Sequence, residues 1–251
     1  MSKDRGTLVH ESGATPPEAV GRSADVARFV EALRATPRAG SGRGRLIFAL
    51  DATASREPTW DRACHIQAEM FEAAASAGSA AGGAGGALEI QLVFYRGFGE
   101  CKAAAWASDP ATLLRQMQSV RCLPGQTQLV RVLDHARKEA AARKVDALVF
   151  VGDMMEEDID ALGQAAGGLG LAGVPCFIFH EGGDPVARRA FQHVARLTRG
   201  ACVPFDSSSA DQLRELLKAV AVYAAGGYKA LQRHAAAGSG PAALLTHALK
   251  R

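Results

Sequence analysis

The chain has 251 residues, of which 48% are hydrophobic and 22% are charged, and this composition is typical of a folded globular protein. Its formal net charge of +3 is too small to indicate a nucleic-acid-binding protein. No apolar run approaches the ~20 residues of a membrane-spanning helix, and the five cysteines lie far apart without a Cys-x-x-Cys pair, so we expect a cytoplasmic protein without membrane contact, disulfides or a zinc ribbon.

The first 43 residues precede the predicted globular domain. Residues 1–22 contain several Gly, Ser and Pro residues and are predicted to be flexible. Ser23 is a typical helix N-cap and is followed by apolar residues at helical spacing. Residues 23–43 are therefore predicted to form a helix and a glycine-containing linker.

Strands and helices alternate along the rest of the chain. An apolar run from Leu46 to Leu50 is typical of a strand buried on both faces of a sheet. Strands are predicted at residues 45–51, 88–95, 101–106, 147–152, 174–180 and 201–205. Helices are predicted to begin near residues 58 and 110 and to span 128–143, 156–167, 186–198 and 210–225, with a Gly/Ala-rich connector at 78–86.

This alternation predicts a single α/β domain over residues 44–225. Repeated β-α-β units favour a doubly wound, Rossmann-like, mostly parallel six-stranded sheet with helices on both faces. Residues 101–106 follow a tight turn and are predicted to form one antiparallel edge strand. Residues 226–251 are predicted to form a helical tail with helices at 228–237 and 242–251.

Oxygen-bearing side chains follow the first buried strand. Asp51 ends the apolar run, and the hydroxyls of Thr53 and Ser55 come at alternate positions after it. In open α/β sheets, ligands bind at the carboxyl ends of the strands. One carboxylate and two hydroxyls, without sulfur or imidazole, suit Mg²⁺, Mn²⁺ or Ca²⁺ better than zinc.

Two later segments add oxygen donors at the same predicted edge. Thr127 lies in a Gly-Gln-Thr loop, and Asp153 ends the buried strand at 147–152. If that strand is the neighbour of the first one, both acids point into one crevice. The predicted metal ligands are therefore Asp51, Thr53, Ser55, Thr127 and Asp153.

This pattern resembles the metal-ion-dependent adhesion site of von Willebrand factor type A domains. The resemblance rests on Asp-x-Thr-x-Ser at 51–55, a later Thr in a Gly-containing loop and an acid at a strand end. It covers residues 44–225 and includes the order of the elements. Three positions depart from the family pattern: Thr53 replaces the commoner Ser, Met154 replaces Gly after the acid, and Leu129 stands where the family has a second Thr.

The resemblance implies a protein-binding domain that is not an enzyme. An ion held mainly by neutral hydroxyls keeps an open coordination position, which an Asp or Glu side chain of a partner protein can fill. Bacterial cytosolic members of the family often serve as adaptors, so the implied partner is a protein such as an ATPase or an assembly complex. The expected cofactor is Mg²⁺. The loop residues Phe98, Met154, Met155 and His180 are predicted to form a partner-binding rim around the ion.

Three other interpretations of the same residues stay open. Thr127, and Asp153 with Glu156, match helix caps as well as metal ligands. A haloacid-dehalogenase-like phosphatase would also use Asp51, Thr127, Lys144 and Asp153 in this order, although it needs an acid where this chain has Thr53. A scaffold with a vestigial metal site is the third.

Overall fold

A six-stranded sheet forms the centre of the computed structural model, which describes residues 43–79, 88–205 and 210–237. The predicted flexible N-terminus, most of the 23–43 helix and linker, most of the 78–86 connector and the helix at 242–251 lie outside the described residues. The strands are β1 (Gly44–Asp51), β2 (Leu88–Arg96), β3 (Glu100–Ala103), β4 (Ala147–Gly152), β5 (Cys176–Glu181) and β6 (Ala201–Phe205).

The strand order is β3-β2-β1-β4-β5-β6. All neighbouring pairs are parallel except β2 and β3, which pair in antiparallel fashion at one edge. The predicted doubly wound sheet with one antiparallel edge strand is therefore confirmed. Strand β1 lies at the centre, between β2 and β4, as its uninterrupted apolar sequence requires.

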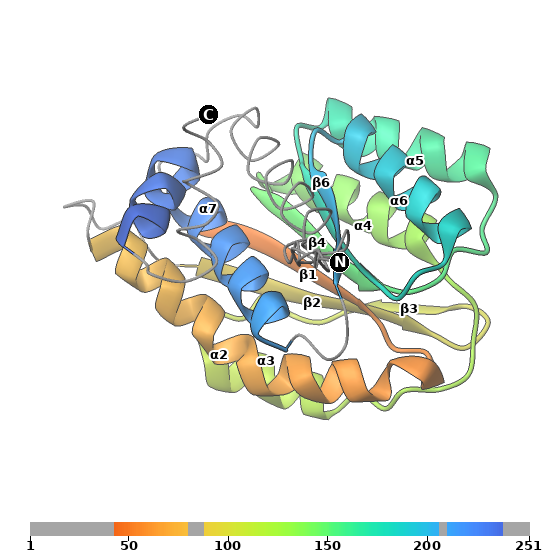
Figure 1. Cartoon of the computed structure of the whole chain (residues 1–251), viewed down its shortest axis with the longest axis horizontal. Coiled ribbons are helices and arrows are strands. Elements are labelled where there is room, and N and C mark those ends of the chain that lie inside the picture. The colour runs from red at the N-terminus through yellow and green to blue at the C-terminus, as the bar shows by residue number, and fades with distance from the viewer. Residues whose placement is uncertain (1–42, 80–87, 206–209, 238–251) are drawn as a thin grey trace, which may run out of the picture.

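Helices cover both faces of the sheet (Figure 1). They are α2 (Glu57–Ser79), α3 (Pro110–Gln118), α4 (Leu129–Ala142), α5 (Ile159–Leu171), α6 (Pro185–Leu197) and α7 (Ala210–Ala237). Helices α2, α3 and α7 pack on one face, where alternate β1 side chains such as Phe48 contribute to the core. Helices α4, α5 and α6 pack on the other face, which receives Ile47 and Ala49.

Two helices differ from their predicted ranges by more than one residue. Helix α5 begins three residues later than predicted, because the Asp158 side chain caps it by accepting hydrogen bonds from the backbone N–H groups of Asp160 and Ala161. Helix α7 continues past the predicted end at residue 225, but Gly227 has φ 67° and ψ −170°, so the chain bends there into a second helical segment. The predicted glycine break is thus a kink between two helices.

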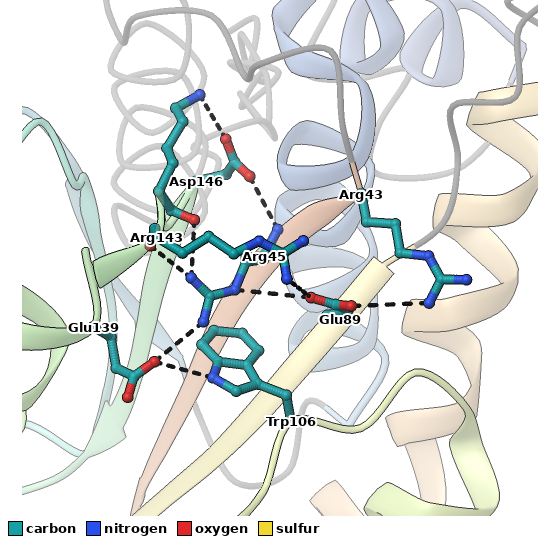
Figure 2. A network of polar contacts seen from close by, with 8 residues as sticks. Arg43, Arg45, Glu89, Trp106, Glu139, Arg143 and Asp146 are labelled. Atoms are coloured by element: carbon teal, nitrogen blue, oxygen red, sulfur yellow. Dashed lines mark hydrogen bonds and ion pairs between the residues drawn. The ribbon is translucent and has the colours of Figure 1, made fainter. Parts of the chain in front are cut away.

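A polar network closes the amino edge of the sheet (Figure 2). Arg45 in β1 is buried, its guanidinium donates to Glu139 at 3.1 Å, and its backbone N–H donates to Asp146 at 2.9 Å. The guanidinium also lies 3.8 Å from the centre of the Trp106 ring and 3.8 Å from the carboxylate of Glu89. Arg45 therefore links β1 to β2, to α4 and to the residue that precedes β4.

Candidate metal centre

The carboxyl edge of the sheet brings Asp51 and Asp153 to the same place. Strands β1 and β4 are parallel neighbours in which Leu50 pairs with Val151, so Asp51, one residue after Leu50, and Asp153, two residues after Val151, both lie at the carboxyl edge. The turn after β1 is a short 3-10 helix (Ala54–Arg56) that leads directly into α2. This turn sets the Thr53 and Ser55 side chains beside the end of β4.

A chain of contacts joins four of the five predicted ligands. The backbone N–H of Thr53 donates to Asp51 Oδ1 at 2.8 Å, and Thr53 Oγ1 lies 3.4 Å from Ser55 Oγ. Ser55 Oγ in turn lies 3.4 Å from Asp153 Oδ2, to which it donates. The structure therefore gathers two carboxylates and two hydroxyls from two loops that are 98 residues apart in the sequence.

Thr127, the fifth predicted ligand, is buried and is tied to the loop that carries Asp153. Its Oγ1 accepts a hydrogen bond of 3.0 Å from the backbone N–H of Glu156, and its own N–H donates to Glu156 Oε2 at 3.2 Å. Helix α4 begins two residues later with Gln128 as its N-cap residue, so Thr127 does not cap it. The cap interpretation of Thr127 is wrong.

Glu157 holds the start of α4 against the same loop. Its carboxylate accepts hydrogen bonds from the backbone N–H groups of Leu129 at 2.5 Å and Val130 at 3.0 Å. Burial raises the pKa of Glu157, although the two N–H donors favour its charged form. Glu156 and Glu157 thus clamp the Thr127 segment to the β4–α5 loop, and they bond across the loops instead of forming a first turn of α5.

Replacing Glu157 with glutamine is expected to destabilise the protein by about 2 kcal/mol, since a charged acceptor of two backbone N–H groups is lost and an amide N–H₂ faces one of them. Denaturant unfolding measures this change. Asp160→Asn is the matched control, because Asp160 is an exposed acid in the first turn of α5. A Glu157→Gln protein as stable as the Asp160→Asn protein would contradict the clamp.

A close contact between two glycines places the loop that carries Thr127 against the turn between β2 and β3. A Cβ added to Gly125 would lie 2.3 Å from the backbone N and O of Gly97, in the turn between β2 and β3. The N–H of Gln126 donates to the Gly97 carbonyl at 3.1 Å, and the Gln128 side chain donates to the same carbonyl at 3.3 Å. Only glycine at position 125 allows this approach.

The charge of Asp51 is poorly compensated. Its side chain is 3% exposed, and burial raises its pKa, while the hydrogen bonds from Thr53 lower it. The hydroxyl of Tyr95 is buried beside it, and burial together with the Asp51 carboxylate raises the pKa of Tyr95 well above its ordinary value, so the phenol keeps its proton. A buried carboxylate of this kind gains from a bound cation.

The side-chain donors gathered at this edge are all oxygen atoms. Within residues 43–79, 88–205 and 210–237, no group of three or more His, Cys, Asp or Glu side chains is arranged to hold a metal. An ion at this edge would be held by two carboxylates and by hydroxyl oxygens, which suit Mg²⁺, Mn²⁺ or Ca²⁺.

Arg56 is a charged residue of this site that sequence reasoning missed. It directly follows Ser55 and is 3% exposed. Its Nη2 lies 2.5 Å from Glu181 Oε2, at the end of β5, and its Nη1 lies 3.8 Å from Asp153 Oδ2. Thr59 Oγ1 donates to the same Glu181 oxygen at 2.5 Å. The position of a basic residue directly after the Asp-x-Thr-x-Ser motif was the feature of the sequence that could have indicated its role.

The predicted rim is only partly exposed. Phe98 is 82% exposed and Met154 is 44% exposed, whereas Met155 and His180 are buried. Met155 packs in the core under α4–α6, and the His180 ring packs edge-on against Phe191 at 5.2 Å. The prediction that Met155 and His180 lie on an exposed rim is therefore wrong.

His180 instead supports the backbone of Asp153. Its Nε2 lies 3.2 Å from the Asp153 carbonyl oxygen, and because a carbonyl only accepts, this nitrogen carries the proton. Burial lowers the pKa of His180, which favours the neutral ring.

The lysine of the phosphatase alternative does not lie with the acids of that alternative. Lys144 precedes β4 and pairs with Asp146 at 2.7 Å, at the amino edge of the sheet. Asp51 lies at the carboxyl edge, so the lysine that such an enzyme would place beside its nucleophile is at the opposite end of the strands.

Solved structures with the same fold include three informative ones. The chain is similar to a von Willebrand factor type A protein from Catenulispora acidiphila, with 12% identity over 72% of this chain and 43% of that one and a TM-score of 0.57. It is similar to proximal thread matrix protein 1 from the mussel byssus with a zinc-occupied MIDAS motif, with 13% identity, coverage of 72% and 46%, and a TM-score of 0.56. It is also similar to the SpRpn10 VWA domain, with 14% identity, coverage of 71% and 95%, and a TM-score of 0.53.

These similarities establish the fold. The chain spans less than half of the first two proteins and almost all of the third. No family model and no curated protein matches the chain by sequence. Among the described helices, none has the length and apolar character that crossing a membrane requires.

Proposed function

Because the chain has the fold of von Willebrand factor type A domains, we propose that it is a protein-interaction domain which binds one divalent cation and uses it to hold an acidic side chain of a partner protein. Asp51, Thr53, Ser55, Thr127 and Asp153 would hold the ion. The proposed ion is Mg²⁺, and Mn²⁺ or Ca²⁺ fit the same oxygens. The bound ion supplies a positive centre that attracts a carboxylate.

The contact chain from Asp51 to Asp153 carries this proposal. It links carboxylate and hydroxyl oxygens from two loops at the edge where open α/β sheets bind their ligands. The neutral hydroxyls of Thr53 and Ser55 neutralise none of the charge of an ion, so such an ion remains attractive to a further carboxylate.

A chelator experiment tests the proposed function. The immobilised full chain is exposed to a lysate in Mg²⁺, washed, and then treated with EDTA. We expect a partner that is retained in Mg²⁺, released by EDTA and bound again when Mg²⁺ is restored. A partner that stays bound throughout the EDTA wash would exclude a metal-bridged contact.

The exposed apolar residues at the same edge are proposed to contact the partner around the ion. Phe98 lies in the turn after β2, and Met154 directly follows Asp153. Leu123 is 44% exposed, and its backbone N–H donates to the Ala52 carbonyl at 3.0 Å, which places it over the loop after β1. Apolar side chains that are buried around a charged contact add binding energy and exclude water from it.

Replacing Phe98 and Met154 together with serine is expected to weaken partner binding at least about tenfold, because buried apolar area is lost at the interface. The Mg²⁺ affinity should stay within about twofold, since neither side chain bears a ligand oxygen. Titration calorimetry measures both. Leu171→Ser is the control, because Leu171 is 93% exposed at the far end of α5. Equal partner affinity in the double variant and the control would exclude this rim.

A further inference from the structure

Arg56 is a buried cation inside the proposed metal centre. Its side chain enters the site from the 3-10 turn that follows Thr53, and its two terminal nitrogens face two acids, Glu181 at 2.5 Å and Asp153 at 3.8 Å. Its Nε and Nη2 are buried and have no hydrogen-bond partner among the described residues, so the contact of Nη2 with Glu181 is an ion pair. A guanidinium is always charged at physiological pH, so this positive charge is permanent.

Glu181 holds the guanidinium in place. Glu181 Oε2 forms an ion pair with Arg56 and accepts a hydrogen bond from the hydroxyl of Thr59, which lies in the first turn of α2. This arrangement draws one terminal nitrogen of Arg56 toward β5 and leaves the other facing Asp153. Arg56 is therefore shared between an acid outside the proposed ligand set and an acid within it.

The charge balance around Arg56 suits the binding of one divalent ion. Three acidic side chains, Asp51, Asp153 and Glu181, lie around one guanidinium, so the acidic groups outnumber the basic one by two. A divalent cation would neutralise that excess. A second cation in a buried site repels the first, and this repulsion is much larger than in water.

We infer that Arg56 is a built-in counter-cation that limits the affinity of this centre for divalent ions, by sharing Asp153 with the ion and by repelling it. The inference rests on the proposed function, since it concerns the same site. Arg56 is a positioning residue, because it acts on the ion through Asp153 and through its charge. Glu181 has the opposite effect, because it neutralises Arg56.

The test compares Arg56→Gln, Arg56→Lys and Glu181→Gln in the full chain. Titration calorimetry gives the dissociation constants for Mg²⁺ and Mn²⁺, and circular dichroism establishes that each variant is folded. We expect Arg56→Gln to bind both ions at least about tenfold more tightly, because a repelling charge is removed. Glu181→Gln should bind them at least about fivefold more weakly, and Arg56→Lys should stay within about threefold of the wild type.

These directions separate a charge effect from a structural one. If Arg56 only supported the loops, the Lys and Gln variants would both lose affinity, and this result would overturn the inference. Should Arg56→Gln not fold, a loss of affinity in Arg56→Lys equal to that in Glu181→Gln would overturn it as well. If the wild type binds the ions and Arg56→Gln has the same dissociation constants, the inference about Arg56 is overturned and the proposed function is not. A wild type and variants that all bind no ion would overturn the proposed function with it.

Discussion

Replacing Asp51 with asparagine is expected to abolish detectable Mg²⁺ binding, with a loss of affinity of at least about a hundredfold. Asp51 is the most deeply buried acid of the centre, and its carboxylate starts the contact chain through Thr53. Asparagine has the same shape and still accepts the Thr53 hydrogen bond, but it carries no charge, and a hard cation depends on charged oxygens. Titration calorimetry of the full chain in Mg²⁺ and Mn²⁺ measures the change.

Glu57→Gln is the matched control for Asp51→Asn. Glu57 is an exposed acid at the first position of α2, so its replacement removes one negative charge near the same edge without removing a proposed ligand. Its effect on Mg²⁺ affinity should be less than about threefold, because exposed charges are screened. A similar loss in both variants would indicate a diffuse electrostatic effect and not a site.

The same pair of variants addresses the phosphatase alternative. A generic phosphate ester with Mg²⁺ should not be hydrolysed, because Thr53 offers no acid for the leaving group and Lys144 lies at the opposite edge. Hydrolysis by the wild type that Asp51→Asn abolishes and Glu57→Gln preserves would assign the site to phosphoryl transfer instead.

The sheet and its acidic edge could be predicted because both depend on local sequence. A run such as 46–50 is apolar throughout because β1 is buried on both faces, and such a strand belongs at the sheet centre. Asp51 and Asp153 end such strands, so parallel pairing alone brings them together. The von Willebrand factor type A fold was predicted from these features and is confirmed.

The contacts between the loops could not be predicted. Glu157 bonds to the start of α4, 28 residues before it, and Arg56, just after β1, forms an ion pair with Glu181 at the end of β5. Neither pairing leaves a periodic pattern in the sequence. The burial of Met155 was missed for the same reason, because it depends on packing against residues of helices that are distant in the sequence.

Replacing Arg45 with methionine is expected to destabilise the fold by about 3 kcal/mol, the largest effect on stability among these variants, because it leaves two partly buried acids and two carbonyl groups without their guanidinium donor. The Arg45 side chain is 6% exposed, and the two acids that face its guanidinium, Glu89 and Glu139, are 17% and 27% exposed. Methionine keeps the apolar contact with Trp106 but provides no donor for Glu139 or for the carbonyl groups that Arg45 binds. Denaturant unfolding followed by circular dichroism measures the free energy.

Arg143→Met separates burial from charge, because Arg143 contacts the same Glu89 at 3.0 Å but is 56% exposed (Figure 2). Its loss should cost less than about 1 kcal/mol, since water and salt screen an exposed pair. Arg45 lies farther from Glu89, at 3.8 Å, so a ranking by distance predicts the opposite order. An Arg143→Met protein that is destabilised as much as Arg45→Met would mean that the amino edge is held by its exposed charges and not by the buried guanidinium.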